Sequence, residues 1–347
     1  MLTTESAQHI TSQSVGYASP AQPAATAVNR MGVAVGAGWV KATNGRDIVK
    51  ARSLVLETEP ADFFGTNSKN WRVELLNSAL GSGVFYVGDK VDGNPGTKSL
   101  ANGEKGHFYG VLALAAVAQL LPQDQPQRLH TVELACSIPT QGMKAQLEGL
   151  KGHHLVNVNR TNLQVNVARV VAQPEGLGTC AKIASLQAAK GAPAASFAVL
   201  DIGFANTTIT GLDEENTLLG FHSTVPGVAK LYETIAARIN SNGHPATIEE
   251  VRLGVETPGG ATFRLKGHSA NNFENQYYAE LERWFDARLS AIATGAQAIL
   301  DKAQYKFVAG GGGQLPGVRD LAKARGYGIA SEPQEKEVQG LYLLAHQ

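Results

Sequence analysis

A carboxylate, a glycine and two hydroxyl groups lie close together on a predicted turn in the second half of the chain. The apolar run Phe197–Leu200 predicts a buried strand that ends at Asp201, bends at Gly203 and resumes with the β-prone residues Thr207 and Thr208. Gly203 allows a ligand to approach the backbone closely, and the amide groups of such a turn bind anions. Asp201 would repel a bare anion, so a metal ion bridging its carboxylate and a phosphate is one interpretation. A β-hairpin whose aspartate caps the turn is the alternative.

A second turn of the same kind lies near the N-terminus. Val33–Val35 predicts a strand, Gly36 and Gly38 predict the turn, and Lys41 ends it where an ammonium group could meet phosphate oxygens. Gly36 and Gly38 also fit the start of a dinucleotide-binding motif, which needs a third glycine and then a helix. Lys41 occupies the position of that third glycine and a strand is predicted to follow, so a dehydrogenase is disfavoured.

A third glycine turn follows the predicted strand Phe307–Ala309. Consecutive glycines do not favour regular structure, and bare backbone suits contact with a planar group such as a purine base or ribose. Pro316 fits the first turn of the helix that we expect next. A flexible linker is the alternative, which the flanking strand and Pro316 disfavour. The glycines of this turn are Gly310, Gly311, Gly312 and Gly313.

The order of the three turns resembles that in the actin–hexokinase–Hsp70 superfamily. That pattern has a first phosphate loop, a second phosphate loop that opens with Asp-x-Gly, and a late adenosine loop of glycines, here at Gly36, Asp201 and Gly310. Within the superfamily, residues 31–347 are most similar to the prokaryotic actin-like proteins of the plasmid-partitioning ParM group. The strand end Cys136–Pro139 and the closing stretch Glu332–Leu341 support this resemblance.

The resemblance implies an α/β chain with the two-domain actin-like ATPase fold, in which duplicated ribonuclease H-like domains enclose a nucleotide cleft. We expect domain I at residues 31–190, with residues 330–347 packing back on it, and domain II at residues 191–329. Residues 1–30 are rich in Ser, Thr, Gln, Ala and Pro and predict a disordered N-terminal extension.

The resemblance also implies the cofactors, ATP or ADP with Mg²⁺, and a role for each turn. Asp201 would hold the metal ion and arrange the catalytic water. The residues that would bind the nucleotide are Gly36, Gly38, Lys41, Gly203, Thr207, Thr208, Gly310, Gly311, Gly312 and Gly313.

Glu175 is the second catalytic candidate, and two interpretations of it stay open. In the partitioning actins, a glutamate directly after such a proline faces the γ-phosphate and positions the attacking water. A carboxylate can orient or deprotonate water in this way. Alternatively, Pro174 and Glu175 begin the helix Leu177–Ala188, where a proline costs nothing and a carboxylate complements the helix dipole.

One departure from the family pattern concerns the metal. Seven positions before the lysine of the first phosphate loop the family has an aspartate that helps to hold magnesium and its waters, and this chain has Ala34 there. Gly36 and Lys41 match the pattern. We therefore expect nucleotide binding with reduced metal affinity or reduced hydrolysis.

Two predicted helices complete the second half of the chain. Phe273–Asp301 carries an apolar stripe that indicates core packing, formed by Leu281, Phe285, Leu289, Ile292, Ala296 and Ile299 and widened by Trp284. Thr247 and Glu250 predict a capping box at the start of a shorter helix. The resemblance would bring Glu250 or Arg252 to the ribose or base, and charges in solvent are the alternative.

Composition excludes several classes of protein. The chain has 347 residues with 30 basic and 30 acidic side chains, so its charge indicates no direct contact with nucleic acid. Cys136 and Cys180 lie in apolar surroundings and predict buried free thiols in a reducing cytoplasm. We expect a cytoplasmic protein without membrane contact, because no apolar run approaches the length of about 20 residues that a membrane span needs. Val111–Leu121 is the most apolar stretch and predicts a buried helix.

These observations favour an actin-like protein that polymerises into filaments with ATP and serves plasmid or DNA segregation. Its partners would be copies of itself and an adaptor protein that binds DNA. Two alternatives remain: a small-molecule kinase of the same superfamily, and a filament protein that binds nucleotide and hydrolyses it weakly. For the favoured filament protein, the enzymatic activity would be hydrolysis of ATP, impaired to the extent that Ala34 weakens the metal site.

Overall fold

The computed structural model describes residues 28–57, 71–92, 94–100, 105–125, 128–138, 141–257, 259–265 and 268–347. Most of the predicted N-terminal extension therefore lies outside the described residues, as does Pro139. The first strand begins at Asn29, two residues before the predicted boundary of that extension.

The first lobe is built on a large mixed sheet. Within the described residues, ten strands form it in the order β3-β2-β1-β8-β10-β9-β5-β6-β4-β7. Neighbouring β1, β8 and β10 run parallel, and the other pairs run antiparallel. The strands are β1 (Asn29–Val35), β2 (Trp39–Thr43), β3 (Ile48–Arg52), β4 (Leu54–Leu56), β5 (Trp71–Asn77), β6 (Gly83–Val87), β7 (Lys98–Ser99), β8 (Leu129–Ile138), β9 (Gly152–Val158) and β10 (Thr161–Pro174).

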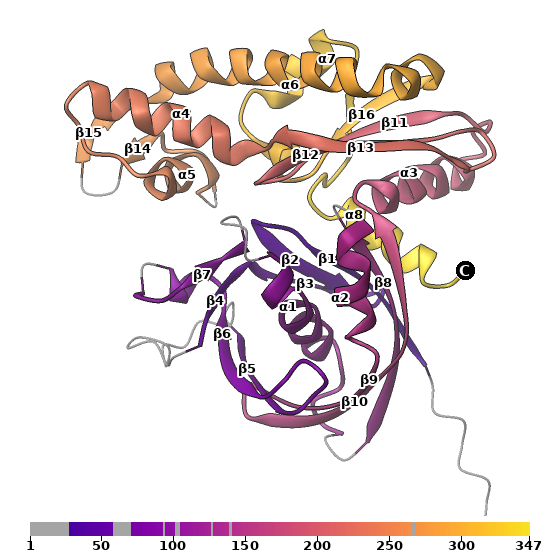
Figure 1. Cartoon of the computed structure of the whole chain (residues 1–347). Coiled ribbons are helices and arrows are strands. Elements are labelled where there is room, and N and C mark those ends of the chain that lie inside the picture. Colours follow the sequence, from indigo (N-terminus) through magenta and orange to yellow (C-terminus); the bar gives the residue numbers. More distant parts are fainter. Residues whose placement is uncertain are drawn as a thin grey trace, which may run out of the picture.

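Helix α1 (Lys105–Gln119) covers one face of this sheet together with the short helix α2 (Lys144–Glu148) (Figure 1). Every side chain from Val111 to Ala118 is buried, because the helix is apolar on all sides and packs into the concave face of the sheet. The prediction of a buried helix in this stretch is confirmed.

The second lobe is built on a smaller sheet with the strand order β13-β12-β11-β16-β17 in the described part of the chain. The long helix α6 packs against β11, β12 and β13 of this sheet, and α4 and α7 pack against α6. The elements of this lobe are β11 (Phe197–Ile202), β12 (Asn206–Leu212), β13 (Leu218–Pro226), α4 (Val228–Ser241), α5 (Ile248–Glu256), the hairpin β14 (Arg264–Leu265) and β15 (His268–Asn272), α6 (Glu274–Lys302), β16 (Tyr305–Ala309), α7 (Val318–Ala324) and β17 (Gly328–Ile329).

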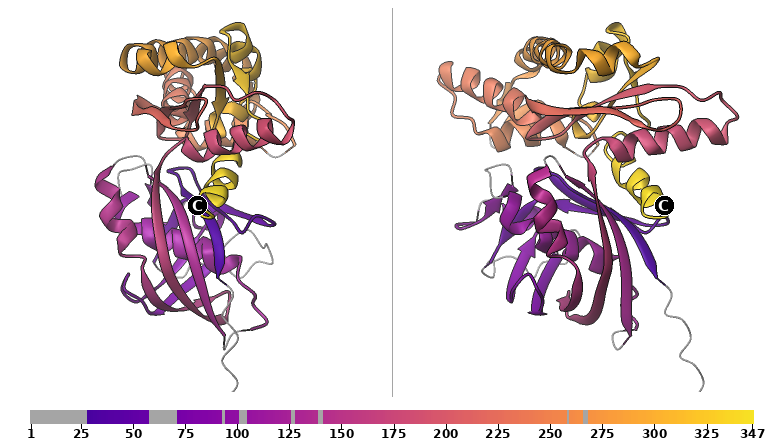
Figure 2. Two further views of the ribbon diagram at one scale, coloured as in Figure 1. Left: turned by 90° about the vertical axis from the view of Figure 1, so that its right-hand side faces the viewer. Right: turned by 45° about the vertical axis from the view of Figure 1, so that its right-hand side comes forward.

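Two helices, α3 (Leu177–Ala189) and α8 (Lys336–Leu344), lie between the two sheets, as the views of Figures 1 and 2 show. Glycines allow the close packing. A Cβ on Gly340 would lie 1.6 Å from the carbonyl oxygen of Gly178, and a Cβ on Gly32 would lie 2.3 Å from that of Val338. Helix α8 is thereby held tightly against both α3 and strand β1.

Three local predictions agree with the structure: the core stripe of α6, the capping box of α5 and the two buried thiols. On α6, all the predicted core residues are buried except Leu289, which is half-buried. Thr247 and Glu250 form the predicted capping box at the start of α5. Cys136 and Cys180 are buried free thiols, as expected.

Candidate functional site

The three glycine turns meet in one cavity between the two lobes. This central cavity has a volume of about 600 Å³ and is lined by the turn after β1, the turn after β11 and the turn after β16. Strands β11 and β16 are parallel neighbours, with Asp201 beside Ala309, so both of their turns leave the same edge of the second sheet. That edge, at the carboxyl ends of parallel strands, is where open α/β sheets bind ligands.

The first turn is a tight hairpin that touches the second. The amide of Gly36 donates to the carbonyl of Trp39 at 3.0 Å, and the hydroxyl of Ser53 donates to the carbonyl of Gly36 at 2.6 Å. A Cβ on Gly38 would lie 2.9 Å from the Cβ of Phe204 in the second turn. Glycine at this position therefore permits contact between loops from opposite lobes.

The third turn packs directly on the end of β11. Gly310 has φ 79°, and a Cβ there would lie 2.4 Å from the carboxylate of Asp201. The glycines do adopt regular structure, since Gly311–Gln314 forms a 3-10 turn, and our expectation to the contrary was wrong. Pro316 lies two residues before α7 rather than in its first turn, and it lines the cavity.

Lys41 and Asp201 carry opposite charges and lie near each other in the wall of the cavity, a part that we call the cavity floor. The ammonium group of Lys41 donates to the carbonyl of Gln334 at 2.7 Å. Desolvation lowers the pKa of Lys41, while the charges of Asp201 and Glu337 act in the opposite direction. Desolvation raises the pKa of Asp201 to about 6, against the effect of Lys41 and with that of Glu175. This floor can hold a negatively charged group only if cations or amide donors compensate the carboxylates.

Glu337 is buried at the first turn of α8 and also lines the cavity. Burial, and next the charge of Asp201, raise the pKa of Glu337 to about 8, while hydrogen bonds from Thr179 act against the shift. Its carboxyl group accepts hydrogen bonds from the amides of Gly176 and Thr179 at 3.2 and 2.9 Å. It therefore satisfies backbone donors at the N-terminus of α3.

Glu175 lies in the turn between β10 and α3. Its amide donates to the carbonyl of Ile138 at 3.1 Å, and its carbonyl accepts from the hydroxyl of Thr210 at 2.7 Å. Pro174 ends strand β10, and Gly176, with φ 89°, precedes the helix. The interpretation that Pro174 and Glu175 form the first turn of the helix is therefore wrong, and Glu175 instead lines the cavity.

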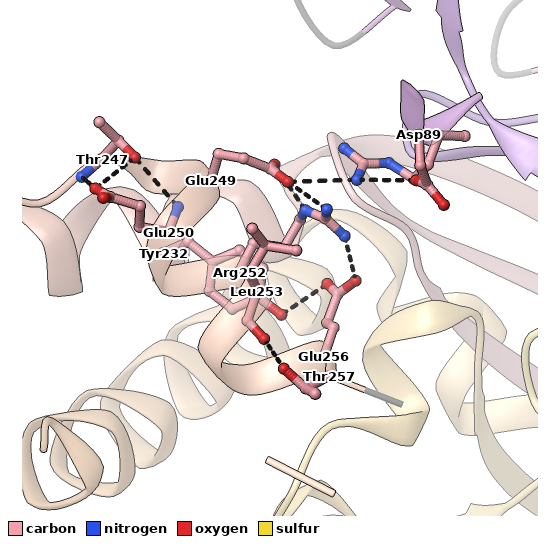
Figure 3. A network of polar contacts seen from close by, with 10 residues as sticks. Asp89, Tyr232, Thr247, Glu249, Glu250, Arg252, Leu253, Glu256 and Thr257 are labelled. Carbon is pink, nitrogen blue, oxygen red and sulfur yellow. Dashed lines mark hydrogen bonds and ion pairs between the residues drawn. The ribbon is translucent and has the colours of Figure 1, made fainter. Parts of the chain in front are cut away.

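A network of ion pairs lies where α5 meets the first lobe, and Figure 3 shows Glu249 and Asp89 facing each other there. Arg52 of β3 lies between them, with its Nη1 atom 3.5 Å from Glu249 and 3.8 Å from Asp89. Arg252 is buried and donates to Glu249 at 2.7 Å and to Glu256 at 3.1 Å, so the expectation of a solvated charge is wrong for it. Glu256 lines the cavity, which links this network to its wall.

The structure brings most of the sequence-predicted site residues to the cavity. Those that line it are Gly36, Gly38, Lys41, Glu175, Asp201, Gly203, Gly310, Gly311 and Gly312. The side chain of Thr207 instead donates to the carbonyl of Pro226, and Thr208 is buried with no hydrogen-bond partner for its hydroxyl within the described residues. The predicted residues that do not line the cavity are Thr207, Thr208 and Gly313.

The cavity-lining side chains that sequence reasoning missed include Trp39, Glu256 and Glu337. Trp39 is the first residue of β2, directly after the first glycine turn, and a large side chain there was a usable signal. Glu256 and Glu337 lie at the ends of helices, where a carboxylate usually indicates only solvation or a dipole contact. Nothing local distinguishes these two from ordinary helix-terminal residues.

The donor set of the cavity suits a metal ion that is shared with a bound phosphate group. Among the described residues, no three His, Cys, Asp or Glu side chains are placed to hold a metal ion by themselves. Mg²⁺ is usually held by one or two carboxylates, phosphate oxygens and water. Asp201 at the cavity floor is a carboxylate of this kind, so the residues present fit Mg²⁺ bound together with a nucleotide.

Comparison with known proteins supports this description. Residues 32–178 match the family described as the N-terminal domain of actin-like proteins. A ParM filament structure from Clostridium botulinum superposes with a TM-score of 0.70 at 16% sequence identity, covering 92% of this chain and 99% of that one. The chain has the two-domain actin-like fold. The predicted resemblance to the prokaryotic actin-like proteins and the predicted fold class are both confirmed.

Two other structures share the actin-like fold. The actin-like protein Alp7A has a TM-score of 0.66 at 14% identity, with 91% of this chain and 95% of that one covered. The archaeal actin homologue Ta0583 in complex with ADP has a TM-score of 0.67 at 15% identity, with coverage of 92% and 99%. No curated protein sequence matches this chain. Within its described residues, the chain has no helix with the length and apolar character of a membrane span.

Proposed function

We propose that this protein binds ATP or ADP with Mg²⁺ in the central cavity and assembles into filaments. The observation that carries the proposal is the meeting of three glycine turns, from both lobes, around one cavity of about 600 Å³. The volume suits a small-molecule ligand. In this proposal the predicted domains, residues 31–190 and 191–329, grip the nucleotide from opposite sides.

The phosphate groups would lie at the cavity floor, between the turns that contain Gly36 and Gly203. Lys41 would bind phosphate oxygens there, and the turn amides would add donors. Asp201 would hold the magnesium ion, which supplies positive charge against the phosphates when bound. The turn from Gly310 to Gly312 would contact the adenosine.

Glu175 would orient the attacking water, because it lines the cavity from a turn whose backbone is held by hydrogen bonds on both sides. A second candidate function is a filament protein with weak hydrolysis. It is favoured by Ala34, which lies directly opposite Lys41 on neighbouring strands, where a carboxylate would face the ammonium group.

Copies of the chain are the expected partners, since relatives with this fold are described as a filament and as actin-like proteins. We further propose a role in plasmid or DNA segregation in the cytoplasm, through an adaptor that binds DNA. The balance of 30 basic and 30 acidic side chains gives the chain itself no global attraction to nucleic acid.

Sedimentation with ATP, with ADP and without nucleotide, run beside an assay of phosphate release, tests the proposal. We expect pelleting with ATP, and a Lys41→Gln variant that binds fluorescently labelled ADP about tenfold more weakly, because it loses a charge-assisted contact. Lys151→Gln removes an exposed lysine that pairs with Glu148, away from the cavity, and should behave as wild type.

The possible outcomes separate the alternatives. Pelleting without phosphate release favours the weakly hydrolysing filament protein, and turnover only with an added sugar or metabolite identifies a kinase. Failure of the wild-type protein to bind ATP or ADP would refute the proposal.

A further inference from the structure

Helix α8 brings a carboxyl group into the cavity from the last residues of the chain. Its close approach to α3 depends on Gly178, where a Cβ would lie 2.3 Å from the carbonyl oxygen of Glu337 and 3.1 Å from its carboxyl carbon. Glu337 thus lies against the first turn of α3. Glu337 is 6% exposed, so its side chain contacts other groups of the protein and hardly any solvent.

The two oxygens of this carboxyl group have different partners. Oε1 accepts from the amide of Gly176 at 3.2 Å. Oε2 accepts from the amide of Thr179 at 2.9 Å and from its hydroxyl at 3.1 Å. One oxygen therefore holds the turn that carries Glu175, and the other holds the helix that follows.

Residue 34 lies under the same helix. Ala34 is buried against α8 in a cluster with Val338, the residue after Glu337. The segment that supplies the Glu337 carboxyl group thus covers the position where the family pattern has an aspartate. Both facts place Glu337 at the end of the cavity where the proposed chemistry takes place.

We propose that Glu337 is a positioning residue that acts through Glu175. By accepting from the amide of Gly176, it fixes the turn in which Glu175 points into the cavity, while Thr179 anchors the other oxygen. This inference rests on the proposed hydrolysis of ATP. Glu337 touches no reacting atom in it, and its effect on turnover passes through the orientation of Glu175.

Glu337→Gln tests the inference with little change of shape. The amide oxygen can still accept from Thr179, but the NH₂ group then faces the amide of Gly176, and that hydrogen bond is lost. We expect faster hydrogen exchange in the backbone segment 172–180 of the nucleotide-free protein, and phosphate release slower by about tenfold. The affinity for labelled ADP should change less than about twofold.

Glu332→Gln is the matched control, because it makes the same change five residues earlier in the chain, at an exposed residue that pairs with Lys336. It should leave both exchange and phosphate release unchanged. In a Glu175→Ala background, Glu337→Gln should slow the remaining phosphate release by less than about twofold, because residues that act as a unit are not additive.

Three results would overturn the inference. They are unchanged exchange in segment 172–180, wild-type turnover in Glu337→Gln despite faster exchange, and an equal loss of turnover in the wild-type and Glu175→Ala backgrounds. If the wild-type protein binds nucleotide but releases no phosphate, the proposed hydrolysis fails instead, which is a separate result.

Discussion

The close contact between α3 and α8 predicts that one added methyl group, at Gly340, destabilises the protein. In Gly340→Ala the new Cβ would lie 1.6 Å from the carbonyl oxygen of Gly178, whereas ordinary contact begins near 3.4 Å. The two helices would have to separate by the difference, about 1.8 Å. A separation of that size would move Glu337 away from the backbone amides that it accepts from.

Two opposing effects decide whether Gly340→Ala raises or lowers the free energy of unfolding. Alanine is favoured over glycine inside a helix by about 1 kcal/mol, which would stabilise α8 if the space were free. Overpacking of a close contact costs up to about 3 kcal/mol, and occasionally more. We therefore expect the free energy of unfolding to fall by about 2 kcal/mol, and Tm to fall by about 4 to 8 °C.

Thermal unfolding followed by circular dichroism measures this change, with Gly149→Ala as control. Gly149 is an exposed residue at the end of α2, where the nearest atom to a new Cβ is the carbonyl oxygen of Gln146 at 3.3 Å. That variant should change Tm by no more than about 2 °C. If Gly340→Ala matched or exceeded wild-type stability, the close packing that places Glu337 would be refuted.

Two further predictions concern the cavity and its rim, and a third concerns the buried thiols. Ala34→Asp should raise magnesium-dependent phosphate release about three- to tenfold, because it restores a carboxylate opposite Lys41, whereas Ala34→Asn should not; an equal effect of both would exclude a role of charge. Arg52→Met should speed the release of labelled ADP about two- to fivefold, because it removes the ion pair with Glu249 between the lobes, which is partly exposed and worth about 0.5–1 kcal/mol. Arg30→Met removes an ion pair away from the cavity and should leave that rate unchanged. Burial raises the pKa of Cys136 to about 12, so the thiols of the folded protein should resist a thiol reagent at pH 8 and react only in denaturant, and labelling of the native protein would contradict the buried position.

The sequence alone determined the features that depend on near neighbours in the chain. The glycine turns after β1, β11 and β16 were predictable because short apolar runs and glycines mark strand ends locally. The apolar stripe of α6 and the capping box of α5 follow from helical spacing for the same reason. The order of the turns then indicated the fold.

Tertiary structure decided which side chains face the cavity. Thr207 and Thr208 lie on the strand next to Asp201, yet neither lines the cavity. Thr208 pairs directly with Asp201 and is buried, whereas Thr207, on the opposite face of the strand, donates to the carbonyl of Pro226. The local sequence predicts that Arg252 is a solvent-exposed charge, but it is buried and forms ion pairs with Glu249 and Glu256 on its own helix. Glu337 reaches the cavity because glycines on three separate elements, Gly32, Gly178 and Gly340, let α8 pack closely. This packing joins segments far apart in the chain, so no local sequence pattern predicts it.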